Sequence, residues 1–181
     1  LITYIDEYGF EYSFTAYLVR KNVEVNIPTH IGATEIDGLL NTKNDISITF
    51  GENIYATYTR NNGEEVAYHS GDVLKKDGIY RFTIIDYAAN ATLLTIKKDT
   101  AVEFSFVDSD SGNVIENGSI VNSSKIEFKD LNKDSAYIEK VTLNGVLQAD
   151  FAGSKFTENG KWEIIVRDKI GNRAYFCFYV V

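Results

Sequence analysis

Apolar and polar residues alternate along much of this chain, which is the pattern of half-buried β-strands. The alternation is clear over residues 46–50 and 80–84 and less regular over 162–166. A period of two residues places one face of a strand in a core and leaves the other face polar, as in antiparallel sheets. No segment shows a convincing helical period with caps. The pattern therefore predicts an all-β protein.

Turn signals separate the expected strands at short intervals. They are Asn-Gly or Asp-Gly pairs, which favour tight turns. The pairs lie at residues 62–63, 77–78, 117–118, 144–145 and 159–160. Many short strands joined by such turns are typical of a β-sandwich.

One five-residue motif occurs three times. The segment Asp-Tyr-Ala-Ala-Asn at 86–90 recurs 82 positions later as Asp-Lys-Ile-Gly-Asn at 168–172, and a diverged copy occupies 6–10, 80 positions earlier. A fixed long period indicates an array of similar modules.

The 82-residue offset holds between residues 55 and 90 without a gap. Upstream of this stretch the offset becomes 80, which a two-residue difference in one loop explains. The matched pairs at 82 are Tyr55 with Tyr137, Gly63 with Gly145, Gly71 with Gly153, Gly78 with Gly160 and Tyr80 with Trp162; those at 80 include Gly38 with Gly118 and Ile46 with Ile126.

We therefore predict two complete domains, residues 22–99 and residues 100–181, which we call the middle repeat and the last repeat. Residues 1–21 are predicted to be the C-terminal hairpin of a preceding repeat. The linkers are only a few residues long and carry no Gly/Ser-rich or Pro-rich spacer. Short linkers restrict the angle between modules, which favours a semi-rigid rod.

The N-terminal hairpin has an unusual position in this scheme. A lone two-stranded hairpin is marginally stable in water, and its unpaired edges invite strand addition. We therefore expect self-association through this hairpin. The chain has no Met and starts abruptly at Leu1, so we expect it to be a fragment of a longer protein.

Charge narrows the classes of partner. The sequence has 18 Lys and Arg against 26 Asp and Glu, a net charge of −8. This balance disfavours nucleic acid, whose phosphates require a basic face. No run of 18 apolar residues is present, so we expect no membrane insertion within this fragment. The single cysteine, Cys177, excludes an intrachain disulfide and a cysteine-based zinc cluster.

Candidate chemistry is sparse. The segment 108–113 begins like a calcium loop, but its glycine comes one position early and Ser119 stands where a bidentate Glu is needed, so a polar hairpin turn is the better interpretation. His30 and His69 lie in different expected loops, and Cys177 has no identifiable base. We therefore predict no catalytic residue, no cofactor, no metal and no enzymatic activity.

Aromatic residues provide the candidate ligand contacts. Tyrosine occurs 12 times, and the last expected strand places Tyr175 and Tyr179 on its outer face. Exposed aromatic rings can stack on a sugar or on a partner protein. The alternative is that such rings cover a junction between modules or fill the edges of a sandwich.

Each full copy of the motif belongs to a longer pattern with a glycine, an aromatic residue, an aspartate and an asparagine. The glycine allows a sharp turn, and the aromatic residue points into the core. The aspartate can accept backbone N–H groups in the hairpin turn, and the asparagine tolerates a left-handed φ there. The positions are Gly78, Tyr80, Asp86 and Asn90, and then Gly160, Trp162, Asp168 and Asn172. The aromatic near an Asp/Asn-Gly corner resembles the tyrosine corner of immunoglobulin-like sandwiches.

This pattern resembles the bacterial immunoglobulin-like repeats of Gram-positive cell-surface proteins, which typically end in a Gly-x-Tyr strand, an Asp-x-Ala-Gly-Asn turn and a closing strand. The resemblance implies tandem immunoglobulin-like β-sandwiches in an extracellular stalk or adhesin segment, on a bacterial cell surface or secreted. It carries no binding residue to this chain, so the protein or glycan ligand stays unidentified. We expect a non-catalytic spacer or adhesive module. The alternative is a carbohydrate-binding or accessory module of a secreted glycan-active enzyme.

Overall fold

The structure is a computed structural model that describes residues 2–5, 7–14, 22–27, 31–123, 125–131, 136–149, 151 and 156–181. Its regular elements over these residues are β-strands joined by turns, and they form several separate sheets. The all-β prediction is confirmed. None of the described residues belongs to a helix long and apolar enough to cross a membrane.

Two compact units divide the chain, and their boundaries cut across the repeats. The first unit holds residues 1–28, 47–73 and 79–95, and the second holds residues 29–46, 74–78 and 96–181. The strands of the first unit are β1 (Ile2–Ile5), β2 (Glu11–Phe14), β3 (Val25–Asn26), β6 (Thr49–Phe50), β7 (Ile54–Arg60), β8 (Glu65–Tyr68), nearly all of β9 (Gly78–Asp86) and the first part of β10 (Ala91–Lys98).

The second unit contains the remaining strands together with the end of β10. They are β4 (Thr34–Ile36), β5 (Leu39–Thr42), β11 (Phe104–Asp108), β12 (Val114–Ile115), β13 (Ile120–Val121), β14 (Ile126–Asp130), β15 (Ala136–Leu143), β16 (Val146–Leu147), β17 (Gly160–Asp168) and β18 (Arg173–Val180).

An aromatic cluster forms the core of the first unit. Alternate residues of β9 point inward, so Tyr80, Phe82 and Ile84 are buried, while Arg81 between them is exposed. The rings of Tyr58 and Tyr68 pack against Phe82, at centroid distances of 5.9 and 5.2 Å. The period of two read from residues 80–84 therefore assigns the core face of this strand correctly.

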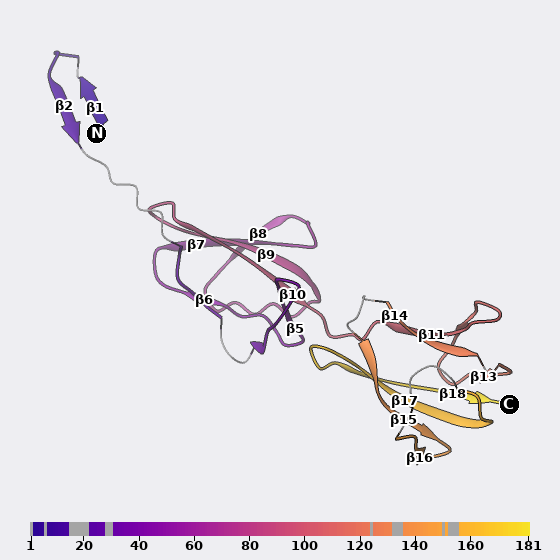
Figure 1. The fold of residues 1–181 in the computed structure, drawn as a ribbon. Helices are drawn as coiled ribbons and strands as arrows, with labels where there is room; N and C mark the ends of the chain where they lie inside the picture. Colours follow the sequence, from indigo (N-terminus) through magenta and orange to yellow (C-terminus); the bar gives the residue numbers. More distant parts are fainter. Residues whose placement is uncertain are drawn as a thin grey trace. The chain divides into compact units, whose positions relative to one another are not determined.

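The last repeat is a two-layered β-sandwich within the second unit. One sheet has the strand order β12-β11-β14 and the other has the order β13-β18-β17-β15-β16 (Figure 1). Phe106 and Ile126 from the first sheet share a buried core with Trp162, Ile164 and Phe178 from the second. The indole Nε1–H of Trp162 donates to the Glu158 carbonyl (3.0 Å), so this buried ring leaves no polar group unsatisfied.

Strand boundaries recur at the spacing that the sequence predicts. β9 and β17 are displaced by 82 residues at both ends, and so are β10 and β18. The two largest sheets share a strand order as well. Five strands of the six-stranded sheet have the order β5-β10-β9-β7-β8, with β4 beside β5, and the five-stranded sheet has the order β13-β18-β17-β15-β16. Tyr80 and Trp162 are 2% and 3% exposed, which confirms that they occupy equivalent core positions.

The N-terminal hairpin repeats the same register. β1 and β2 form a two-stranded antiparallel sheet in which Ile5 pairs with Glu11, as Arg167 pairs with Arg173 in the hairpin β17–β18. Gly9, in the connecting turn, has a φ of 86°. The diverged motif at 6–10 is thus a hairpin turn, as its sequence predicts. Asp6, which would complete the comparison, lies outside the described residues.

One equivalence in the predicted alignment is wrong, because β15 contains a bulge between Ile138 and Lys140. The bulge adds one residue, so the offset is 83 between Asn61 and Asn144. Each of these asparagines makes the same two hydrogen bonds: its N–H donates to a carbonyl, and its Oδ1 accepts the N–H of that same residue. The partner of Asn61 is Ile79 and the partner of Asn144 is Lys161, each one residue after the glycine that begins the strand. Gly63 therefore does not correspond to Gly145.

The turns after β9 and β17 have the predicted aspartate contacts, and their left-handed residue is the one before the asparagine. Asp86 Oδ1 accepts the backbone N–H groups of Ala88 and Asn90, both at 2.9 Å, and Asp168 Oδ1 accepts the corresponding two groups of its own turn. The positive φ falls on Ala89, at 60°, rather than on Asn90. The asparagine instead donates its amide to the aspartate Oδ2, at 2.8 Å in each turn.

Candidate functional site

Tyr175 and Tyr179 lie on the outward face of β18, as predicted. They are 53% and 39% exposed, whereas Phe178 and Val180 on the opposite face are buried. Cys177 lies between the two tyrosines and is partly buried. The alternation along β18 explains this division, because successive side chains of a strand point to opposite faces.

The hydroxyl of Tyr175 is already engaged. It donates to Glu163 Oε1 at 2.7 Å, and Lys161 Nζ lies 2.8 Å from the same oxygen. The lysine, with help from the tyrosine hydroxyl, holds the pKa of the Glu163 carboxyl below its usual range. The hydrogen bond to this carboxylate raises the pKa of Tyr175 to about 12.

The surroundings of this pair form the outer face of a sheet. Ile120 on β13 pairs with Tyr179 and is exposed, and Leu147 on β16 pairs with Thr142 and is also exposed. The face therefore offers apolar surface beside a charged network, without a described hollow that would enclose a small molecule. Ligand contact by Tyr175 and Tyr179 stays a prediction.

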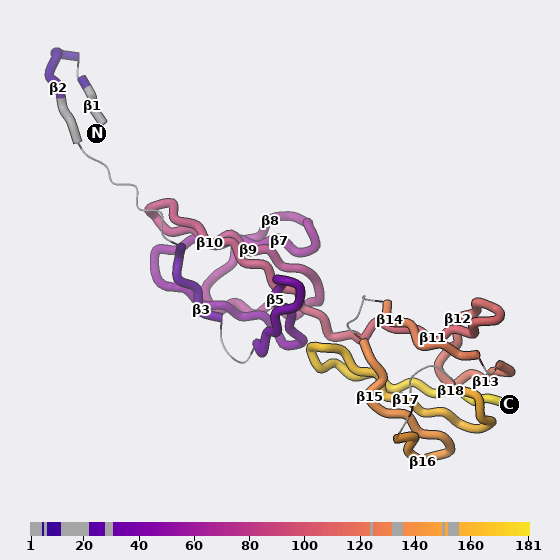
Figure 2. Tube along the Cα trace, in the orientation of Figure 1, coloured from indigo at the N-terminus to yellow at the C-terminus, as the bar shows by residue number. Residues whose placement is uncertain are grey.

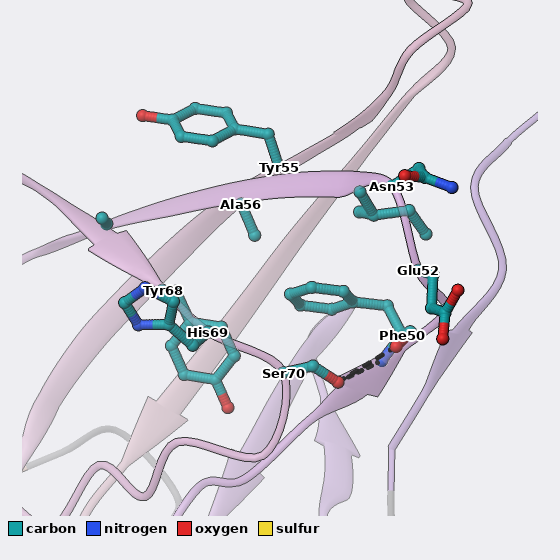
Figure 3. Close-up of a pocket in the computed structure, with 11 residues that line it drawn as sticks. Phe50, Glu52, Asn53, Tyr55, Ala56, Tyr68, His69 and Ser70 are labelled. Carbon is teal, nitrogen blue, oxygen red and sulfur yellow. Dashed lines mark hydrogen bonds between the residues drawn. The ribbon is translucent and has the colours of Figure 1, made fainter.

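A cavity that the sequence did not reveal lies in the first unit. It has a volume of about 360 Å³ and lies between the β6–β7 connection and the end of β8 (Figure 3). Phe50 and Tyr68 contribute aromatic rings to it. Tyr55, on the other side of β7, points away from these rings in Figure 3 and is exposed.

Two hydroxyl groups shape the wall of this cavity by replacing backbone partners. Ser70 Oγ accepts the N–H of Phe50 and donates to its carbonyl, both at 3.0 Å. The Tyr68 hydroxyl accepts the N–H of Ile48 at 2.9 Å and donates to the Asp72 carbonyl at 2.7 Å. Burial raises the pKa of the Tyr68 phenol.

Polar side chains surround the cavity opening. Glu52, Asn53 and His69 are lining residues with exposed side chains, and Asn53 adopts a left-handed φ of 60°. Asp72 accepts the backbone N–H of His69 at 2.9 Å and lies 3.2 Å from its ring Nδ1. The backbone contact lowers the pKa of the Asp72 carboxyl below its usual range.

The cavity escaped prediction because its walls come from two segments that are not adjacent in the sequence. The one sequence feature that pointed to this region was the closeness of three tyrosines, Tyr55, Tyr58 and Tyr68. The structure separates these residues, since Tyr68 is buried, Tyr58 packs against the core rings and Tyr55 is exposed. Phe50, which contributes the other ring, had no distinguishing feature beyond its strand period.

The calcium-like segment that the sequence suggested has a structural role. The segment 108–113 is a hairpin turn between β11 and β12, in which Asp108 accepts hydrogen bonds from Ser111 and Ser123 and Asp110 pairs with Lys125 at 2.8 Å. His30 lies outside the described residues. Within the described part of the chain, no three His, Cys, Asp or Glu side chains are grouped so that they could hold a metal ion.

The chain shows no match to a protein-family model and no significant similarity to a curated protein.

Proposed function

We propose that this chain is a non-catalytic spacer segment of immunoglobulin-like modules, which acts in an extracellular bacterial surface or secreted protein and holds its neighbours at a set separation. The observation that carries this proposal is the path of the chain through each repeat. The chain enters a repeat at one end of its last strand and leaves at the other end, which suits head-to-tail extension.

The entry points are fixed by hydrogen bonds. Near the start of β10, Thr92 Oγ1 donates to the Val23 carbonyl at 2.9 Å. In the last repeat, Asn172 Nδ2, just before β18, donates to the carbonyls of Asp99 (3.0 Å) and Ala101 (3.4 Å). The chain then leaves at the far end of β18, which is the C-terminus (Figure 2). An eight-residue strand separates entry from exit by roughly 25 Å.

The connection between the repeats is tied to both of its neighbours. Asp77 Oδ2 accepts the hydroxyl of Thr100 at 2.5 Å, and the Asp99 N–H donates to the Thr42 carbonyl at 2.9 Å. A further hydrogen bond joins the residue after β5 to the turn before β18: Lys43 Nζ donates to the Gly171 carbonyl at 3.1 Å. All of these residues belong to the second compact unit, so the connection is held within that unit.

A buried lysine reinforces this connection. Lys98 is 3% exposed and lies 3.5 Å from Asp45 and 3.7 Å from Asp77. A buried ammonium group without such partners is strongly unfavourable, so the two carboxylates and Lys98 stabilise one arrangement. Asp77 thus joins Lys98 to the linker residue Thr100.

Parallel pairing of an internal strand with the last strand of each repeat also suits a load-bearing spacer. β5 pairs in parallel with β10, and β13 pairs in parallel with β18. In the last repeat three backbone hydrogen bonds join the segments 118–121 and 177–181. Tension along the chain loads such bonds together rather than one after another. This geometry supports a high unfolding barrier, which governs forced unfolding.

The alternative, a carbohydrate-binding or accessory module, is favoured by one observation. The cavity beside Phe50 has aromatic walls and a polar opening, which is the usual composition of a small-molecule site. A spacer with a ligand site would combine the two functions.

Spin labels on both repeats test the spacer proposal. We would label L93C and V114C, both exposed positions, in the full chain carrying C177S, and measure the distance distribution by electron–electron double resonance. We expect one narrow distribution, which widens in D77A/N172A but not in the control D110A. A broad distribution in the parent chain would contradict the proposal.

A further inference from the structure

The walls of the cavity beside Phe50 present aromatic surface. The ring centroids of Phe50 and Tyr68 are 6.2 Å apart and the rings are inclined at 53°. Tyr68 is 3% exposed and its hydroxyl is bound to Ile48 and Asp72, so this residue supports the wall from within. The partly buried ring of Phe50 supplies the aromatic surface that a ligand can reach. The C–H bonds on one face of a sugar ring carry partial positive charge and pack favourably on the negative face of an aromatic ring.

The opening supplies hydrogen-bonding groups of both kinds. The Glu52 carboxylate accepts, while the Asn53 amide and the His69 imidazole each offer a donor and an acceptor. A ligand with several hydroxyl groups, each of which donates and accepts, matches this set. An aliphatic ligand would leave these groups without a new partner.

Charge excludes acidic ligands. None of the described lining residues is a lysine or an arginine, Glu52 is at the opening, and Asp72 accompanies His69. The chain as a whole carries a net charge of −8. Phosphates, sulfates and uronic acids would therefore be repelled, whereas a neutral ligand is unaffected.

From these features we propose that the cavity binds one neutral hexopyranose unit of a glycan. Its volume of about 360 Å³ is near the lower limit for small-molecule sites, which suits a single ring. The site would make the middle repeat a glycan contact in addition to any spacing role. The inference does not depend on the spacer proposal, because spin-label distances and sugar binding are measured separately.

Nuclear magnetic resonance titration of the full chain tests this proposal. The probes are methyl-α-glucopyranoside, methyl-α-mannopyranoside, methyl-β-galactopyranoside and N-acetylglucosamine, with glucuronic acid as the charged comparison. We expect at least one neutral sugar to shift the backbone amides of residues 50–56 and 67–70, saturably, with a Kd of about 1–10 mM. Glucuronic acid should bind at least tenfold more weakly.

Variants locate the site. F50L keeps an apolar side chain but removes the ring, and E52A changes an exposed acceptor whose loss should leave the fold intact; each should weaken binding at least fivefold. The matched control is Y87A, because Tyr87 is an aromatic residue of the same repeat that is 90% exposed and does not line the cavity. Unchanged affinity in Y87A supports the proposal. The absence of a saturable shift with every neutral sugar at 50 mM would overturn it, and so would unchanged binding in E52A and in folded F50L.

Discussion

Ala89 and Gly171 occupy the same left-handed backbone position in two copies of one hairpin turn. Their φ angles are 60° and 88°, and each N–H donates to the carbonyl of the turn's aspartate, at 3.0 Å from Ala89 to Asp86 and at 3.1 Å from Gly171 to Asp168. Left-handed φ is strained for a residue with a Cβ and unstrained for glycine. The middle repeat therefore keeps a backbone strain that the last repeat lacks.

Replacing Ala89 with glycine should stabilise the protein. The change relieves a strain of roughly 1–2 kcal/mol, partly offset by the greater freedom of glycine in the unfolded chain, so we expect a net gain of about 0.5–1 kcal/mol. Urea unfolding measures it as a higher midpoint. The control is A88G in the same turn, where φ is not left-handed and the change should lower the midpoint. Equal effects of the two changes would contradict this account.

Tyr80 and Trp162 should contribute similarly to stability, because they are equivalent buried rings. Each change to alanine should cost about 3–5 kcal/mol in the free energy of unfolding, as for large aromatic residues in cores. Denaturant unfolding followed by circular dichroism measures this cost. The control is Y87A, since Tyr87 is 90% exposed and its loss should change the free energy by less than about 0.5 kcal/mol. A small effect at either core ring would contradict the equivalence.

The Tyr68 hydroxyl should be important for stability apart from its ring. In Y68F the ring remains, but the buried N–H of Ile48 loses its partner, which should cost about 1–3 kcal/mol. The control is Y55F, at an exposed position with the same chemical change. Hydrogen exchange of the Ile48 amide gives a second measurement, with faster exchange expected in Y68F alone. Equal stability of the two variants would show that the hydroxyl is dispensable.

Deleting residues 1–19 should leave both repeats folded and reduce self-association. The hairpin β1–β2 forms its own two-stranded sheet, and Ile5 and Phe10 are exposed. Sedimentation velocity of the full and shortened chains compares their association, and circular dichroism compares their folding. Loss of structure in the middle repeat would show that the boundary near residue 22 is wrong.

Local sequence rules predicted the features that depend on nearby residues. The period of two assigned the core faces of β9 and β18, and the repeated motif located the hairpin turns, because both features rest on contacts within a few residues. The motif did not identify which residue of the turn is left-handed, and the asparagine amide bonds to Asp86 or Asp168. In each turn the residue before the asparagine, Ala89 or Gly171, adopts the left-handed φ.

Features that depend on distant segments were missed. The bulge at Glu139 has no sequence signal of its own, although its carboxylate lies 3.2 Å from Arg167 on β17 and 2.6 Å from Arg173 on β18. The cavity beside Phe50 arises where a serine and a tyrosine hydroxyl take the place of strand backbone. Such substitutions depend on tertiary packing, which alternation of residue types does not encode.

The contact between Tyr175 and Glu163 makes a prediction for alkaline pH. Because the Glu163 carboxylate accepts the phenol's hydrogen bond, folding favours the neutral tyrosine and raises its pKa from the ordinary 10.0 to about 12. This stabilisation is fully present below pH 10 and is lost as the pH rises through about 12. The tyrosine should therefore ionise later than most exposed tyrosines, in a chain that circular dichroism shows to be still folded.

Carbon-13 resonance of the tyrosine ring Cζ measures this ionisation, and the Y175F spectrum assigns the signal. In E163Q the acceptor charge is removed, so the pKa of Tyr175 should fall toward 10. E139Q is the matched control, because Glu139 pairs with Arg167 and Arg173 on the same sheet and no contact joins it to Tyr175 among the described hydrogen bonds. If Tyr175 ionised near pH 10 in the parent chain, the hydrogen bond to Glu163 would not persist in solution, and the ring would be as free to meet a ligand as Tyr179.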